Sequence, residues 1–233
     1  MDTSGSIAKD DFVKQKEFVN RLVASFGFES QKYGIILFSY VAEMPIKFTD
    51  YNRLDAFKAA VLKLPQAGSI TRIDRGLLLA QKKLFTKEGG NRPEANRVLF
   101  LLTDGSQTYS DDVVDNALIS KNIRYSGTEF LVLGIGRGVD RDELNKIAGG
   151  KETVYVVDSF EKLKSQEFVN SFNISCSKSL LFILFFFNQS QVIYISPKYM
   201  IEFLNSTFCT EFILFYNGNL LEKNIIIIIK FST

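Results

Sequence analysis

The fold is decided by the stretch Arg97-Val-Leu-Phe-Leu-Leu-Thr103, which is followed directly by Asp104-Gly105. An apolar run without polar interruption is typical of a strand that is buried on both faces of a parallel sheet. Aspartate and glycine are turn residues, so they indicate where this strand ends. A similar run, Tyr33-Gly-Ile-Ile-Leu-Phe-Ser39, lies earlier in the chain and predicts a second strand that is covered on both faces.

Helical and extended patterns alternate along the chain around these two strands. Apolar residues at helical spacing predict one amphipathic helix up to Phe26, which Gly27 ends, and another at 72–85. Residues 41–48 alternate more strongly and contain Pro45, so they are expected to form an edge strand. The remaining predicted elements are helices at 53–63, 111–121, 140–148 and 159–172, and strands at 128–134 and 153–157. This order predicts the α/β class, with a doubly wound, mostly parallel open sheet and helices on both faces.

The composition excludes several classes of function. The 233 residues include no histidine, which rules out serine–histidine triads and histidine zinc sites. The two cysteines, Cys176 and Cys209, lack the C-x-x-C spacing and indicate neither a zinc site nor a disulfide scaffold. Because 28 basic and 26 acidic residues give a net charge of +2 without a basic stripe, nucleic acid is not an expected partner.

The character of the sequence changes near residue 177. Apolar clumps such as Leu180–Phe187 and Ile225–Ile229 follow neither the strand nor the helix period. No clump reaches the roughly 18 apolar residues of a membrane-spanning helix, so a membrane is not an expected partner. We expect residues 1–176 to form the domain. Residues 177–233 are interpreted as an apolar low-complexity tail that is not a native domain, and we hypothesise that residues 180–233 are translated non-coding sequence.

Polar residues gather where the predicted strands end. In an open α/β sheet, ligand sites form beyond the carboxyl ends of the strands, and the predicted topology places a D-x-S-x-S loop and two further segments there. The predicted metal ligands in these segments are Asp2, Ser4, Ser6, Thr71 and Asp104. Hydroxyl and carboxylate oxygens suit Mg²⁺, with Mn²⁺ or Ca²⁺ as alternatives. Because three of the five ligands are neutral, a bound ion would stay electrophilic and attract an acidic side chain of a partner.

The same segments resemble the metal-ion-dependent adhesion site of von Willebrand factor type A domains. The matching motifs are D-T-S-G-S at 2–6, T-R-I-D-R-G at 71–76 and L-L-T-D-G at 101–105, and the likeness covers about residues 1–176. The resemblance implies a cation-dependent protein-binding module of the integrin-inserted-domain, matrilin or microfibrillar-collagen type, extracellular or at the cell surface. The implied partner is an extracellular protein such as collagen or another matrix protein, and the implied parent is a larger protein with further domains.

The chain departs from the family pattern at its start. The family has a central first strand before the D-x-S-x-S loop, whereas only Met1 precedes Asp2 here. We therefore expect a domain without its first strand, in a chain truncated at the amino terminus. Unsatisfied buried backbone groups cost about 1–3 kcal/mol each, so losing several would outweigh a typical stability of about 5–15 kcal/mol. Tail residues at 180–187 or 225–229 are an alternative occupant of the empty position.

Other functions stay open from the sequence alone. The chain is also compatible with a structural matrix module whose metal site is vestigial, or with an intracellular scaffold domain of the same family. A phosphatase-like hydrolase with Asp2 as nucleophile would need a second acid in a D-x-D arrangement, and position 4 is serine. The chain is therefore not expected to be an enzyme.

Several other polar residues near the predicted strand ends receive simpler interpretations. Four aspartates are read as helix-start or surface charges rather than ligands. They are Asp74, Asp111, Asp112 and Asp140.

Overall fold

The computed structural model describes residues 1–110, 112–172, 212–214 and 227–229. The chain divides into two units, Met1–Asn173 and Ile174–Thr233. In the second unit, β6 (Phe212–Leu214) and β7 (Ile227–Ile229) pair antiparallel. The alternative that residues 180–187 occupy the first-strand position concerns residues outside the described ranges, as do the readings of Asp111 and Cys176. Within the described ranges, no helix is long and apolar enough to cross a membrane.

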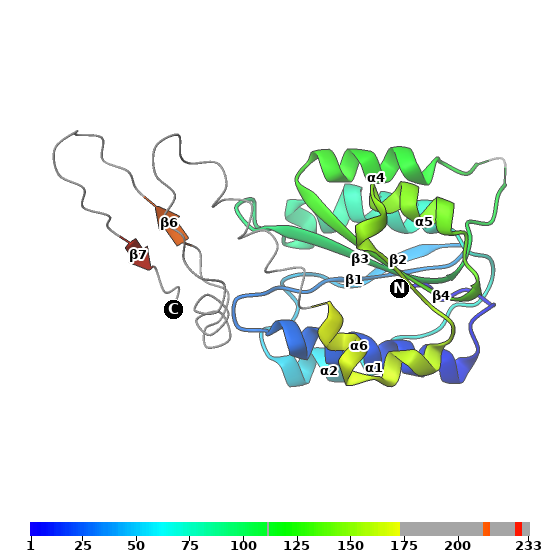
Figure 1. The fold of residues 1–233 in the computed structure, drawn as a ribbon, viewed down its shortest axis with the longest axis horizontal. Helices are drawn as coiled ribbons and strands as arrows, with labels where there is room; N and C mark the ends of the chain where they lie inside the picture. The colour runs from blue at the N-terminus through cyan, green and yellow to red at the C-terminus, as the bar shows by residue number, and fades with distance from the viewer. Residues whose placement is uncertain (111, 173–211, 215–226, 230–233) are drawn as a thin grey trace, which may run out of the picture. The chain divides into compact units, whose positions relative to one another are not determined.

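The first unit contains the α/β fold (Figure 1). Strands β1 (Ile35–Phe38) and β2 (Ala42–Ile46) pair antiparallel. Strands β3 (Arg97–Gly105), β4 (Thr128–Gly138) and β5 (Val154–Val157) run parallel in the order β3-β4-β5. The predicted α/β class with a mostly parallel sheet is therefore confirmed.

The first three residues lie between β1 and β3. Four backbone hydrogen bonds make this connection: Asp2 to Leu102 O (3.0 Å), Thr3 to Phe38 O (2.9 Å), Phe38 to Met1 O (3.1 Å) and Met1 to Ile36 O (2.9 Å). Asp2 pairs with Phe38 in the parallel sense as an isolated bridge. No strand of the described residues lies between β1 and β3, and Met1–Thr3 hold the place where the sequence analysis expected the first strand to end.

Helices cover both faces of the sheet (Figure 1). One face carries α1 (Lys9–Phe26), α2 (Leu54–Leu62) and α6 (Gln166–Ser171), and the other carries α3 (Ile73–Leu79), α4 (Asn116–Tyr125) and α5 (Arg141–Ala148). Gly27 ends α1 with a φ of 86°, a conformation that glycine adopts without strain. The predicted arrangement of helices on both faces is thus present in the first unit.

Each face of the sheet has its own apolar core. Successive residues of β3 point to opposite sides, so Leu102 lies in the core under α1 and Leu101 in the core under α3 and α4. The first core is rich in aromatic rings. The fully buried Phe172 packs on Tyr155, Phe168 and Phe100, with ring centroids 4.6, 5.1 and 5.2 Å away. This alternation explains why the 97–103 stretch is apolar at almost every position.

Three predicted helices have different bounds in the structure. The helix predicted at 159–172 is interrupted at Ser165, whose backbone is extended. A 3₁₀ helix precedes Ser165, and α6 begins after it, because the Ser165 hydroxyl caps α6 by accepting the N–H of Phe168 (3.2 Å). The helix predicted at 111–121 begins only at Asn116, because the carboxylate of Asp115 caps it. The helix predicted at 72–85 is α3 followed by a π-helical turn, Ala80–Leu84.

Only the short segment Met1–Thr3 forms hydrogen bonds to β1 and β3 at this position, and this yields a prediction about stability. Placing five apolar strand-forming residues before Met1 is expected to raise the free energy of unfolding, because they would pair with β1 and β3. Several new hydrogen bonds at about 0.5–1.5 kcal/mol each would give an increase of at least about 2 kcal/mol in urea denaturation. A five-residue Gly-Ser extension is the matched control, and equal stability of the two extended chains would contradict the prediction.

Candidate metal site

The loop after Met1 is held by the side chain of Asp2. This carboxylate is fully buried; its Oδ1 accepts the backbone N–H of Ser4 (2.8 Å) and its Oδ2 accepts the hydroxyl of Thr103 (2.7 Å). The Oγ atoms of Ser4 and Ser6 lie 3.0 Å apart, with Ser4 buried and Ser6 exposed. The loop therefore presents two hydroxyl oxygens from alternate residues at one point.

Asp104 joins this loop from the end of β3. The hydroxyl of Ser6 donates to Asp104 Oδ1 at 2.9 Å. Burial, and after it the negative charge of Asp2, raise the pKa of Asp104 to about 6, although the hydrogen bond from Ser6 acts in the opposite direction. A carboxylate that is destabilised in its ionised form by a neighbouring carboxylate is stabilised by a cation. The donor set and its charge therefore fit a hard divalent ion.

Thr71 approaches from the segment before α3. Its backbone pairs with Thr108, whose N–H donates to Thr71 O (2.8 Å) and whose hydroxyl accepts the Thr71 N–H (3.3 Å). The Thr71 hydroxyl faces Gly105, where an added Cβ would lie 3.7 Å from it. The structure thus joins four of the predicted ligands in one hydrogen-bonded chain, Asp2 to Ser4 to Ser6 to Asp104, and brings Thr71 beside the residue that follows Asp104.

A hollow of about 400 Å³ opens beside the candidate site. Ser6 and Asp104 line one side of it, and Lys14, Arg137 and Asp158 contribute to the other walls. These walls come from α1, from the end of β4 and from the segment after β5, so the hollow is built by different elements of the first unit. It gives a side chain of another molecule room to reach Ser6 and Asp104.

The acidic residues that were read as helix-start or surface charges have distinct environments. Asp140 caps α5 by accepting the N–H groups of Asp142 and Glu143, as expected. Asp112 is exposed and pairs with two arginines. Asp74 lies in the first turn of α3, as the helix-start interpretation expects, but it is fully buried and is therefore not a surface residue.

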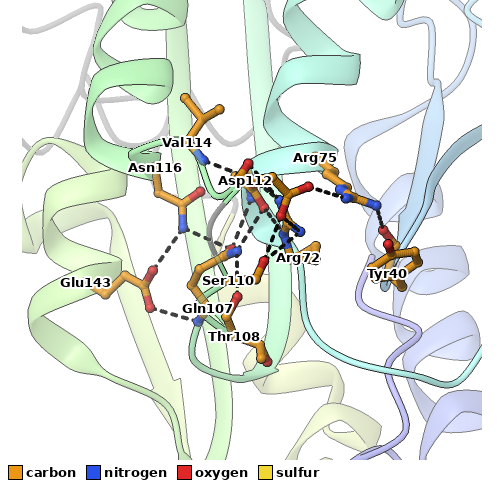
Figure 2. Close-up of polar contacts among 11 residues, drawn as sticks. Tyr40, Arg72, Arg75, Gln107, Thr108, Ser110, Asp112, Val114, Asn116 and Glu143 are labelled. Carbon is orange, nitrogen blue, oxygen red and sulfur yellow. Dashed lines mark hydrogen bonds and ion pairs between the residues drawn. The ribbon is translucent and has the colours of Figure 1, made fainter.

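Asp74 belongs to a polar network that the sequence analysis missed. Figure 2 shows its partners Arg72, Gln107 and Val114 within this network. It forms a buried ion pair with Arg72, in which Nε and Nη2 donate to the two carboxylate oxygens at 2.8 and 2.7 Å. Gln107 and Asp112, from the segment after β3, bind the two members of this pair. The only sequence signal was that Arg72 and Asp74 directly follow Thr71 in the T-R-I-D-R-G motif.

Comparison with known proteins places this fold in a family. The model of the von Willebrand factor type A domain matches residues 1–170. Integrin alpha-M of Mus musculus is 30% identical over 176 residues, and the collagen alpha-5(VI) chain of Mus musculus is 29% identical over 169 residues. The matches cover 71% and 72% of this chain, but only 15% of the integrin and 6% of the collagen.

Solved structures show the same fold. Proximal thread matrix protein 1 from the mussel byssus superimposes with a TM-score of 0.66 at 25% identity, covering 70% of this chain and 42% of that chain. In a further structure of the mussel protein, the metal-ion-dependent adhesion site (MIDAS) motif is occupied by zinc. This structure gives the same TM-score at 24% identity, covering 70% of this chain and 43% of that chain. The family match over residues 1–170, together with the α/β fold, shows that the chain belongs to the von Willebrand factor type A domain family.

Proposed function

We propose that the chain is a divalent-cation-dependent protein-binding module of the adhesion type, and that it binds the acidic side chain of a partner through a metal site. The proposed ligands are Asp2, Ser4, Ser6, Thr71 and Asp104. The observation that carries the proposal is the hydrogen-bonded chain from Asp2 to Asp104, at the end of which burial and the charge of Asp2 destabilise the ionised carboxylate of Asp104. A bound Mg²⁺, or Mn²⁺ or Ca²⁺ in its place, supplies a Lewis-acidic centre for a partner's carboxylate oxygen.

The residues of the site have separate tasks in this proposal. The hydroxyls of Ser4, Ser6 and Thr71 contribute neutral oxygens, so they do not cancel the charge of the ion. Asp2 keeps the loop in shape, because both of its oxygens already accept hydrogen bonds from Ser4 and Thr103. The same contacts argue against Asp2 as a nucleophile, and we assign no enzymatic activity to the chain. The hollow beside Asp104 receives the partner's side chain.

The relatives support a location and a class of partner. Integrin alpha and collagen VI chains match this chain over most of its length, and a matrix protein of the mussel byssus has the same fold. We infer that the module belongs to an extracellular matrix or cell-surface protein and that its partner is an extracellular protein, such as collagen or another matrix protein. A structural matrix module with a vestigial metal site, or an intracellular scaffold domain, is the alternative that the following experiments separate.

Metal binding depends on Asp104 in this proposal. The substitution Asp104→Ala is expected to weaken Mg²⁺ and Mn²⁺ binding by more than about 100-fold, above the 10–100-fold that outer residues of metal sites contribute. Isothermal titration calorimetry measures this effect. Asp158→Ala, which removes a carboxylate from the same hollow but not from the ligand set, is the control. Equal affinities for the wild type and Asp104→Ala would contradict the assignment.

The affinity for the ion should also depend on pH. The pKa of Asp104 is about 6 without metal, and only its ionised form attracts a cation, so a proton competes with the ion below that pH. The apparent Mg²⁺ affinity is therefore expected to be nearly constant above pH 7 and to fall by about tenfold per pH unit below pH 6. Calorimetric titrations between pH 5 and pH 8 measure this profile. A constant affinity down to pH 5 would show that Asp104 does not take part.

Partner binding distinguishes an adhesion module from a structural one. Retention of the chain on immobilised collagen or other matrix proteins is expected in Mg²⁺ and should be lost in EDTA and in Asp104→Ala. Loss of binding follows because the partner's carboxylate would have no cation to coordinate. Equal retention under all three conditions would support the structural module with a vestigial metal site.

A further inference from the structure

Two helices of the first unit begin with the same short pattern. Arg53-Leu-Asp55 starts α2, and Arg72-Ile-Asp74 starts α3, with the arginine at the N-cap and the aspartate in the first turn. In both, the guanidinium binds the carboxylate in a bidentate manner. The Nε to Oδ1 distances are 3.1 and 2.8 Å, and the Nη2 to Oδ2 distances are 2.6 and 2.7 Å. The local geometry of the two pairs is therefore nearly the same.

The surroundings of the two pairs are opposite. The side chains of Arg53 and Asp55 are 77% and 67% exposed, whereas those of Arg72 and Asp74 are 1% exposed each. An exposed pair costs little and contributes little. A buried pair loses the hydration of both charges, and this loss often exceeds the attraction between them. Starting a helix does not require that cost, as α2 demonstrates, so the buried pair has another role.

The buried pair binds the segment that follows β3. The carboxylate of Asp74 accepts Gln107 Nε2 (2.8 Å) and the Val114 N–H (3.3 Å), and the Asp74 N–H donates back to Gln107 Oε1 (3.2 Å). Arg72 donates to the carboxylate of Asp112 (2.9 Å) and to its backbone oxygen (3.3 Å). Burial raises the pKa of Asp74, but the hydrogen bonds from Arg72, Val114 and Gln107 outweigh it and keep that pKa below its usual value. The carboxylate thus remains an ionised acceptor for two chain segments.

These contacts lie next to Thr71, one of the proposed metal ligands, and in the segment that continues from Asp104, another of them. Thr71 directly precedes Arg72, and Thr108 directly follows Gln107. The two threonines are joined by the backbone of Thr71, which accepts the Thr108 N–H at 2.8 Å. The network around the buried pair therefore clamps the segment of Thr71 to the segment that continues from Asp104 (Figure 2).

We propose that Arg72 and Asp74 are positioning residues of the metal site, which hold Thr71 at a fixed place relative to Asp104. The two ligands come from different elements, and the ion needs both at once. The buried pair spans the two segments with charge-assisted hydrogen bonds, which are stronger and more directional than neutral ones. The expected effect of the buried pair on metal affinity rests on the proposed metal site. Its expected effect on the contact between the segments of Thr71 and Thr108 does not.

The test replaces both charges together, so that no buried charge is left unpaired. The double variant Arg72→Met/Asp74→Leu is expected to keep its thermal midpoint within a few degrees, because apolar residues often replace a buried ion pair without loss of stability. Its affinity for Mn²⁺ and Mg²⁺ should fall at least tenfold. The matched control is Arg53→Met/Asp55→Leu, which removes the exposed pair and should bind the ions like the wild type.

Hydrogen exchange of the metal-free protein gives a second readout. The amides of Thr71 and Thr108 should exchange faster in Arg72→Met/Asp74→Leu than in the control, because the hydrogen bonds of the buried pair no longer hold the two segments together. If the double variant does not fold, Gln107→Leu replaces it: this change leaves the ion pair intact, removes the contact to Asp74, and should lower the affinity and the amide protection in the same direction.

The outcomes separate this inference from the proposed function. Wild-type affinity and wild-type protection in Arg72→Met/Asp74→Leu, or in Gln107→Leu, would overturn the positioning role. Wild-type protein that binds neither ion would overturn the metal site, and the exchange rates of Thr71 and Thr108 would then still decide whether the pair holds the two segments together.

Discussion

The position of Asp2 between β1 and β3 is the constraint on which the rest of the structure depends. Its backbone pairs with both strands, and its buried carboxylate fixes the loop of Ser4 and the end of β3 at Thr103. The antiparallel pair β1-β2 and the parallel group β3-β4-β5 are connected through these first residues. One residue therefore links the architecture to the candidate site, and changes that weaken the sheet at this point also disturb the loop that offers the hydroxyl oxygens.

The candidate site combines segments that are distant in sequence, and its electrostatics favour a cation. Burial, and after it the negative charge of Asp2, raise the pKa of Asp104 to about 6, and the hydrogen bond from the Ser6 hydroxyl does not offset these two effects. A divalent cation at this point would stabilise the ionised carboxylate of Asp104. The buried pair of Arg72 and Asp74 adds rigidity on the other side, where it binds the segment after Asp104 to the segment of Thr71. In this account the sheet positions the segments, the carboxylates provide the affinity for the cation, and the ion pair fixes the position of Thr71 relative to Asp104.

The sequence predicted much of the fold because the relevant signals are local. The apolar run at 97–103 predicted a strand covered on both faces, and Leu101 and Leu102 do lie in opposite cores. The break at Ser165 was not predicted, because a serine fits both the interior and the start of a helix. The buried pair was not predictable either, since Arg53-Leu-Asp55 and Arg72-Ile-Asp74 have the same pattern and differ only in what packs over them. The ligand set itself stays a prediction, because Thr71 and Asp104 come from separate segments, and only tertiary structure brings Thr71 beside Gly105, the residue after Asp104.

The central claim is that one divalent cation is held by residues of three segments at the end of the sheet. Anomalous diffraction from crystals of the protein grown with Mn²⁺ tests it most directly. The account predicts a single strong anomalous peak surrounded by oxygens of Ser4, Ser6, Thr71, Asp2 and Asp104. A peak elsewhere in the first unit, or none at this site under Mn²⁺ concentrations that saturate binding in solution, would contradict it.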